Sequence, residues 1–223
     1  MNYTSMTMDT LNPIGCFLII VLFVDFTVTE RYTNITLASK VFKVQVINDW
    51  VLIHQMIPNG QRLFKSNWTK YSNGFGDPTD NYWIGNEQIH QLTSAGYQKL
   101  RVEVQSLNTT KWYSAEYDSF DVSNETNWYT LNVSGYLGDG GDGFNVGQYT
   151  GYISNGMKFS TFDVDNDLYV NGTCSKGYGW WLNICSSSTQ THYNNSWWGA
   201  LVMSGLAPSP YITASRMMVR PRT

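Results

Sequence analysis

The sequence predicts an α+β domain with a central antiparallel sheet, short helices and a loop-rich C-terminal half. Three observations predict this class. Several short segments alternate apolar and polar residues and are separated by turns, a pattern that favours antiparallel strands. Helical patterns are few and short. After about residue 137, glycine-rich and aromatic pieces replace the regular alternation.

Five segments carry the alternation expected of half-buried strands. One face of 99–105 holds Leu100, Val102 and Val104, whereas its other face is charged. Each such segment is expected to place its apolar face on a core. The expected strands are 42–46, 50–55, 99–105, 114–122 and 128–136.

The helical signals lie between these strands. Residues 86–94 predict about two helical turns, because Ile89 and Leu92 are three positions apart and share one side. A second short helix is expected within 63–72. Beyond the glycine-rich turn at 138–144, long loops are expected, and because loops carry binding sites, we expect functional residues there.

Composition excludes several classes of protein. The chain has 223 residues, of which 42% are hydrophobic and 15% aromatic, so it is not intrinsically disordered. Its net charge of −3 leaves no basic surplus for nucleic-acid binding. Only 14% of residues are charged, against the usual quarter, so the surface is expected to be largely uncharged and polar.

The N-terminus predicts a secretory leader. Residues 14–24 form an apolar run, too short for the ~20 residues of a membrane span but suited to a signal-peptide core. We therefore expect a leader over 1–29, cleaved near 27–29, no stable membrane span, and one domain over 30–223; a buried strand is the alternative. Eight N-x-S/T sequons agree with passage through the secretory pathway.

Ordered sequence blocks give the chain a family resemblance. The segment WTKYSNGFGDPTDNYWIGNEQIHQLT (68–93) is followed by LRVEV, AEYDSFDV, VSGYLGDGGD, FSTFDVDND, GWWLNIC and MMVRP. Together these blocks resemble the fibrinogen C-terminal domain family, which includes fibrinogen chains, ficolins, tachylectins, tenascins and angiopoietins. The resemblance implies that family's fold and a secreted, extracellular binding module without enzymatic activity.

The N-terminal part departs from the family pattern. Val46 stands where a cysteine of a first disulfide is expected, and the partner cysteine is also absent. The resemblance therefore implies an abbreviated N-terminal subdomain. No collagen-like or coiled-coil stalk precedes the domain, so we expect a monomer or self-assembly through the domain itself.

Three aspartates, Asp163, Asp165 and Asp167, alternate in one short segment. Carboxylates this close favour a hard cation such as Ca²⁺. An EF-hand is excluded, because Leu168 occupies its glycine position and Cys174 its final glutamate position.

The family resemblance implies a different calcium site in this segment. It assigns side-chain ligation to Asp165 and Asp167, and backbone carbonyl ligation to Tyr169 and Asn171. A solvated acidic turn is the alternative interpretation. Asn171 also begins a sequon, so a glycan could crowd this loop.

A disulfide and a ligand pocket are expected beside the calcium loop. Once the leader is removed, Cys174 and Cys185 are the two remaining cysteines, and an even count suggests one bond. In lectin-like members this disulfide borders an aromatic pocket for acetyl groups, but Ser186 stands where they usually carry histidine. The expected ligand contacts are Tyr169, Tyr178, Trp180, Cys185, Ser186, Tyr193 and Trp197.

Two function classes follow from these residues. The first is a lectin-like module that binds acetylated glycans in a calcium-stabilised pocket. The alternative is a protein–protein ligand or matrix module, which Ser186 favours, because tryptophan and tyrosine also dominate protein interfaces. An enzyme is not expected: the three histidines lack metal-ligand spacing, and no nucleophile motif is present.

Overall fold

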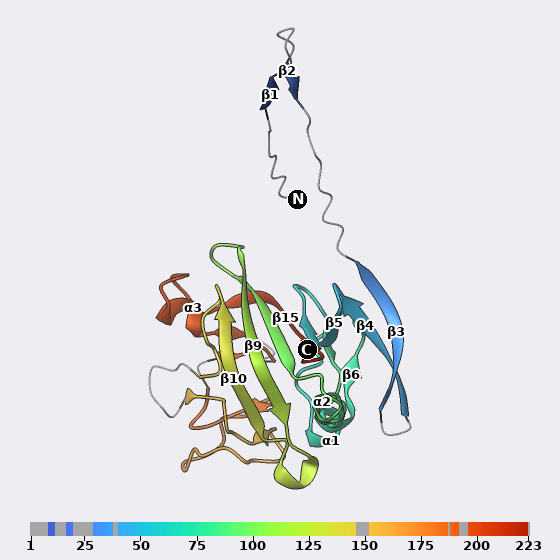
Figure 1. Ribbon diagram of the computed structural model, residues 1–223. Helices are drawn as coiled ribbons and strands as arrows, with labels where there is room; N and C mark the ends of the chain where they lie inside the picture. The colour runs from blue at the N-terminus through green and yellow to red at the C-terminus, as the bar shows by residue number, and fades with distance from the viewer. Residues whose placement is uncertain are drawn as a thin grey trace.

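The computed structural model describes residues 9–11, 17–19, 29–37, 40–145, 152–186, 188–191 and 196–222. One nine-stranded sheet dominates them, and its principal strands run in the order β10-β9-β8-β15-β5-β4-β3 (Figure 1). Every pairing in it is antiparallel, which confirms the predicted class. Those strands are β3 (Glu30–Leu37), β4 (Lys40–Ile47), β5 (Trp50–Met56), β8 (Lys99–Ser106), β9 (Trp112–Val122), β10 (Leu131–Gly138) and β15 (Ile212–Arg220).

The remaining elements are short. Strand β7 (Tyr82–Trp83) pairs with β5 and with β6 (Phe75–Gly76). Three separate two-stranded sheets complete the description. They pair β1 (Asp9–Leu11) with β2 (Phe17–Ile19), β11 (Phe159–Ser160) with β12 (Trp180–Trp181), and β13 (Ser188–Thr189) with β14 (Trp197–Trp198). The helices are α1 (Trp68–Asn73), α2 (Asn86–Ser94), α3 (Ala200–Met203) and the 3-10 turn η1 (Glu125–Asn127).

Strand β8 and helix α2 match their predictions closely. In β8, buried and half-buried residues alternate along the whole strand, as the sequence pattern requires. Helix α2 has the predicted bounds and buries Ile89 and Leu92. His90 of this helix places Nδ1 2.8 Å from the carbonyl oxygen of Val122, which is a structural role.

Two predicted boundaries are wrong. The expected strand at 128–136 begins only at Leu131, because Trp128 and Tyr129 adopt left-handed backbone angles, with φ of 56° and 47°, after η1. The helix expected within 63–72 is shorter than that range: it is α1, which begins at Trp68 and ends at Asn73. Asn67 fixes its first residue, since the Asn67 side chain accepts a hydrogen bond from the Lys70 amide.

Strand β15 lies at the centre of the sheet, although the sequence pattern did not predict a strand there. It pairs with β8 on one side and with β5 on the other (Figure 1). The last strand in the sequence is thus the one that joins the two halves of the sheet.

Aromatic side chains bind the loop-rich half to the sheet half. Phe159 of β11 is fully buried, and its ring lies 5.3 Å from the rings of both Tyr71 and Trp181. The indole Nε1 of Trp181 donates a hydrogen bond of 2.8 Å to the Tyr129 carbonyl. These contacts make one continuous core, so the loops are anchored on a rigid base.

Val46 fills its position as an apolar core residue. Its side chain is 5% exposed, and in the sheet it pairs with Val51 of β5. A valine here completes the packing of β4 without a disulfide. No helix in the described part of the chain is both long and apolar enough to cross a bilayer.

Candidate ligand and calcium site

Cys174 and Cys185 form a disulfide, which confirms the predicted bond. The bond closes a loop between residues 11 positions apart, with the two Cα atoms 5.1 Å from each other. Cys185 has a left-handed φ of 66°, unusual for a residue with a side chain. The carbonyl of Cys185 accepts a hydrogen bond of 3.0 Å from the Asn183 amide, which holds this turn in place.

Asp167 organises the segment that leads into the disulfide. Its Oδ2 accepts a hydrogen bond of 2.7 Å from the Cys174 amide and a longer one, 3.4 Å, from the Thr173 hydroxyl. Its Oδ1 accepts a hydrogen bond of 2.8 Å from the Tyr169 amide. One carboxylate therefore ties both ends of the turn at 169–174 together.

Asp165 lies directly beside Asp167. The Asp167 amide donates a hydrogen bond of 3.2 Å to Oδ1 of Asp165. Partial burial, and after it the negative charge of Asp167, raises the pKa of the Asp165 carboxyl above its ordinary value. Two carboxylates that repel one another are the electrostatic setting that a divalent cation relieves.

Asp163, the first aspartate of the run, has a different role. Its Oδ1 accepts a hydrogen bond of 3.0 Å from the Trp68 amide at the start of α1. The same oxygen accepts a bond of 2.8 Å from the Thr161 hydroxyl. Asp163 thus holds the junction between α1 and the loop, whereas Asp165 and Asp167 lie together in the turn that leads to the disulfide.

The donor set fits a hard cation that uses backbone oxygens. Within the described ranges, no group of three or more His, Cys, Asp and Glu side chains is placed to hold a metal. Two carboxylates would need carbonyl or water oxygens to complete a shell, which is usual for Ca²⁺ and unusual for Zn²⁺. The predicted carbonyl donors, Tyr169 and Asn171, both lie in the exposed turn that Asp167 holds.

Two predicted ligand contacts, Tyr178 and Trp180, are buried aromatic residues. Tyr178 is only 4% exposed, and burial, together with the charge of Asp167, raises the pKa of its hydroxyl to about 12. Trp180 is fully buried, with its ring centroid 6.2 Å from that of Phe144 in a stacked arrangement. These side chains support the site from within and present almost no surface to a ligand.

Ser186 is also internal. Its hydroxyl lies 2.9 Å from the Ser154 hydroxyl and donates a hydrogen bond of 2.7 Å to the Ser188 carbonyl. The position that carries histidine in lectin-like members is therefore used here for internal packing. Tyr193 lies outside the described residues, as does the side chain of Trp197.

Exposed apolar residues lie on the candidate calcium loop and beside it. Leu168 is 57% exposed, Val170 91% and Ile184 44%, and Tyr169 is also exposed. The Leu168 amide donates a hydrogen bond of 2.9 Å to the Asn183 carbonyl, which brings the loop against the disulfide turn beside Ile184. We call Leu168, Tyr169, Val170 and Ile184 the calcium-loop patch; of these, the sequence predicted only Tyr169 as a contact.

Comparison with known proteins identifies the family. The family described as the fibrinogen beta and gamma chains, C-terminal globular domain, matches residues 37–209. The chain belongs to the fibrinogen C-terminal domain family. Fibrinogen C-terminal domains are non-enzymatic binding modules, and they often bind calcium.

Individual relatives agree in sequence and in fold. Human angiopoietin-4 is 36% identical over 204 residues, which cover 86% of this chain and 39% of angiopoietin-4. The chain thus spans about two fifths of the length of this relative. The fibrinogen-like globe domain of human ANGPTL2 has a TM-score of 0.71 and 28% identity, with 87% of this chain and 94% of that domain covered.

A structure with a bound peptide has the same fold. The lamprey fibrin D-dimer, complexed with the peptide Gly-His-Arg-Pro-amide, has a TM-score of 0.75 and 25% identity. The match covers 86% of this chain and 69% of the lamprey chain. The fibrinogen-like fold of this chain is therefore shared with a protein that binds a short peptide.

Proposed function

We propose that this fibrinogen-like domain is a secreted recognition module that binds a protein partner through the calcium-loop patch. The observation that carries this proposal is the exposure of Leu168, Val170 and Ile184 on a loop closed by a disulfide. Several large exposed apolar side chains on neighbouring segments of a folded domain indicate an interaction surface. A loop that is already ordered before binding also loses little entropy when a partner docks.

The chemistry of the patch favours a protein over a sugar. Sugar sites use exposed aromatic faces and polar groups that are free to bond hydroxyls. Here Trp180 is buried and the Ser186 hydroxyl is engaged within the domain, whereas the exposed residues are mostly aliphatic. An aliphatic surface with an aromatic member at Tyr169 suits an apolar protein interface. Acetylated glycans remain the alternative ligand.

Calcium has an indirect role in this proposal. Asp165 and Asp167 would hold the ion, with the carbonyls of Tyr169 and Asn171 completing its shell. The bound ion would neutralise two carboxylates that otherwise repel one another. The ion would hold the patch in place through Asp167, because the hydrogen bonds of Asp167 already fix the turn that carries Tyr169 and Val170.

Secretion, with removal of residues 1–29, is part of the proposal. The Cys174–Cys185 disulfide requires an oxidising compartment to persist. The six sequon asparagines within the described ranges are all exposed and thus open to glycosylation: Asn34, Asn67, Asn108, Asn124, Asn132 and Asn171. N-terminal sequencing of the protein from culture medium should find a start near residues 28–30; an intact Met1 on intracellular protein would contradict secretion.

The binding proposal is tested with purified receptor ectodomains and an acetylated-glycan array, each probed in calcium and in chelator. We expect an ectodomain to bind in calcium, and Val170→Asp to lose that binding, since a charge replaces the most exposed apolar residue of the patch. Leu137→Asp on β10 is the matched control, because Leu137 is 72% exposed but lies outside the patch. Glycan binding that survives Val170→Asp would overturn the protein-ligand proposal.

A further inference from the structure

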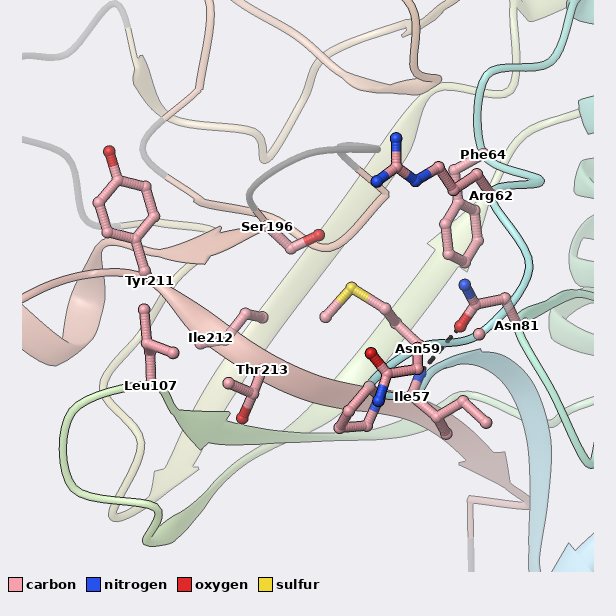
Figure 2. Close-up of a pocket in the computed structure, with 13 residues that line it drawn as sticks. Ile57, Asn59, Arg62, Phe64, Asn81, Leu107, Ser196, Tyr211, Ile212 and Thr213 are labelled. Carbon is pink, nitrogen blue, oxygen red and sulfur yellow. Dashed lines mark hydrogen bonds between the residues drawn. The ribbon is translucent and has the colours of Figure 1, made fainter.

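A cavity lies apart from the calcium-loop patch. Its volume is about 360 Å³, and it is formed where the end of β5 and the loop after it meet the start of β15 (Figure 2). None of the calcium ligands or patch residues lines it. We propose that this cavity binds a peptide segment that carries a carboxylate next to an apolar side chain.

The floor of the cavity is apolar. Leu107 is 51% exposed and lies beside Ile212 in the wall, whereas Phe64 and Ile212 are buried and support this surface from behind (Figure 2). Met56 and Ile57 complete this lining. A volume of this size takes one aliphatic side chain and its neighbouring backbone, and such a floor gains its stabilisation by removing apolar surface from water.

Arg62 supplies a cation at the mouth. Its side chain is exposed and extends across the cavity toward Ser196 (Figure 2). Among the residues that the structure describes, Arg62 has no ion-pair partner, and no acidic residue lines the cavity. A guanidinium group binds a carboxylate best, through two parallel hydrogen bonds. Arg62 has no such partner within the described part of the chain.

The wall beside Arg62 is already ordered. The Ile57 amide donates a hydrogen bond of 2.8 Å to Oδ1 of Asn81, and Nδ2 of Asn81 donates one of 2.7 Å to the Gln61 carbonyl. A β-carbon at Gly60 would lie 2.6 Å from the Asn81 side chain, so this loop packs against Asn81 without a gap. The cavity is thus preformed, which lowers the entropic cost of binding.

Asp80 packs beside Gly60 of the same loop, but among the described residues it forms no ion pair with Arg62. Asp80 accepts hydrogen bonds from the amides of Gln61 and Asn81, at 3.1 and 2.6 Å, and does not line the cavity. A sugar acid would satisfy Arg62, but it would place hydroxyls against the accessible apolar residues Leu107, Met56 and Ile57. A carboxylate next to an aliphatic side chain can form an ion pair with Arg62 and place the aliphatic group against the apolar floor.

Three short peptides test the proposal on the folded, secreted chain: acetyl-Gly-Leu with a free carboxylate, its C-terminal amide, and acetyl-Glu-Leu-amide. Binding is followed by the ¹³C-methyl resonance of Met56, assigned with Met56→Leu, with exposed Met203 as the reference outside the lining. We expect the free acid or the glutamyl peptide to shift Met56 with a Kd on the order of 1 mM. The neutral amide should not shift it.

The variant Arg62→Gln should weaken binding about tenfold or more, because a charge-assisted pair is lost. The matched control is Arg222→Gln, which removes the same charge beyond the far end of β15, about 27 Å along the strand from Ile212. Equal binding of acid and amide, or no effect of Arg62→Gln, would overturn the proposal. Selective binding of N-acetylneuraminic acid or inorganic phosphate would show that the ligand is not a peptide and would also overturn the proposal. Receptor binding is tested with Val170→Asp and should be unchanged in Arg62→Gln, so the two proposals can fail independently.

Discussion

The backbone amide of Trp68 donates a hydrogen bond of 3.0 Å to the carboxylate of Asp163, which lies 95 residues further along the chain. An amide at the first turn of a helix has no partner within the helix, so it requires an outside acceptor. Asp163 supplies that acceptor and fixes the candidate calcium loop to the sheet half of the domain. A residue from an apparent acidic cluster is thus a structural link.

We expect Asp163→Ala to destabilise the domain by about 1 kcal/mol, the usual cost of removing a helix-capping acceptor. Asp163→Asn should lose less, since its amide oxygen still accepts a hydrogen bond. Urea unfolding measures both. The calcium-induced change in Tm should be the same as in the wild-type chain; its disappearance in Asp163→Asn would show that Asp163 is a ligand.

Calcium at about 100 times its Kd should stabilise the folded domain by about 2.7 kcal/mol. Asp165→Asn should abolish that shift without lowering the Tm of the calcium-free protein, because it removes a carboxylate that is repelled by Asp167. Calorimetry in calcium and in chelator measures both quantities. A wild-type Tm that does not respond to chelation would rule out the site.

Asp167→Asn is a less clean test of calcium binding. Asp167 accepts hydrogen bonds from the amides of Tyr169 and Cys174, so its replacement perturbs the loop even without calcium. We expect this variant to lower the Tm in chelator as well as in calcium. Equal Tm values for Asp165→Asn and Asp167→Asn in chelator would argue against this structural role.

Replacing both Cys174 and Cys185 by serine should lower the free energy of unfolding by about 2–3 kcal/mol, because the closed loop is short. Denaturant unfolding under non-reducing conditions measures the loss. The Cys174 amide also bonds to Asp167, so the variant should require more calcium for the same stabilisation. Two free thiols in the untreated mature protein would contradict the bond.

His54 should make the domain sensitive to acid. It is fully buried, and burial lowers the pKa of its imidazole to about 3, against about 6.5 in an unfolded chain. Between these pH values the imidazole is protonated in the unfolded state and neutral in the folded state. The contribution of His54 to the free energy of unfolding is therefore complete above pH 6.5 and decreases as the pH falls toward 3. From pH 7 to pH 5 the loss should be about 2 kcal/mol.

The acid sensitivity is measured by urea unfolding at the two pH values. In His54→Gln the part of the pH slope due to this residue should vanish, although the absolute stability will be lower. His90→Gln is the control, because His90 lies at a half-buried position on α2. An unchanged slope in His54→Gln would refute the assignment.

The sequence predicts elements well where one face is buried and the other is not. Strand β8 and helix α2 have this property, and their patterns give the correct element at the correct place. Strand β15 lacks it: Met217, Met218 and Val219 are buried in succession, and the register shifts at Met217. Central position and a bulge together remove the alternation by which a strand is recognised.

For the candidate site, too, the sequence predicts some features and not others. The disulfide follows from the number of cysteines, and the choice of Asp165 and Asp167 follows from the run of aspartates together with the family resemblance, so sequence reasoning could propose them. The accessibility of aromatic residues depends on tertiary packing, and Trp180 in the core looks the same in sequence as a tryptophan in a pocket. The exposure of Leu168 and Val170 could be suspected only because they are apolar within a run of Asp, Asn and Gly.

The central place of β15 has a consequence for biosynthesis. Strands β8 and β5 each pair with β15 and do not neighbour one another, so the two halves of the sheet have no direct ladder between them. The ribosome makes β15 after every other strand of this sheet, at about 5–20 residues per second, and until β15 emerges the nascent chain holds two unjoined half-sheets with open edges. A premature stop before residue 212 would therefore release a chain that cannot close its sheet and is prone to aggregate.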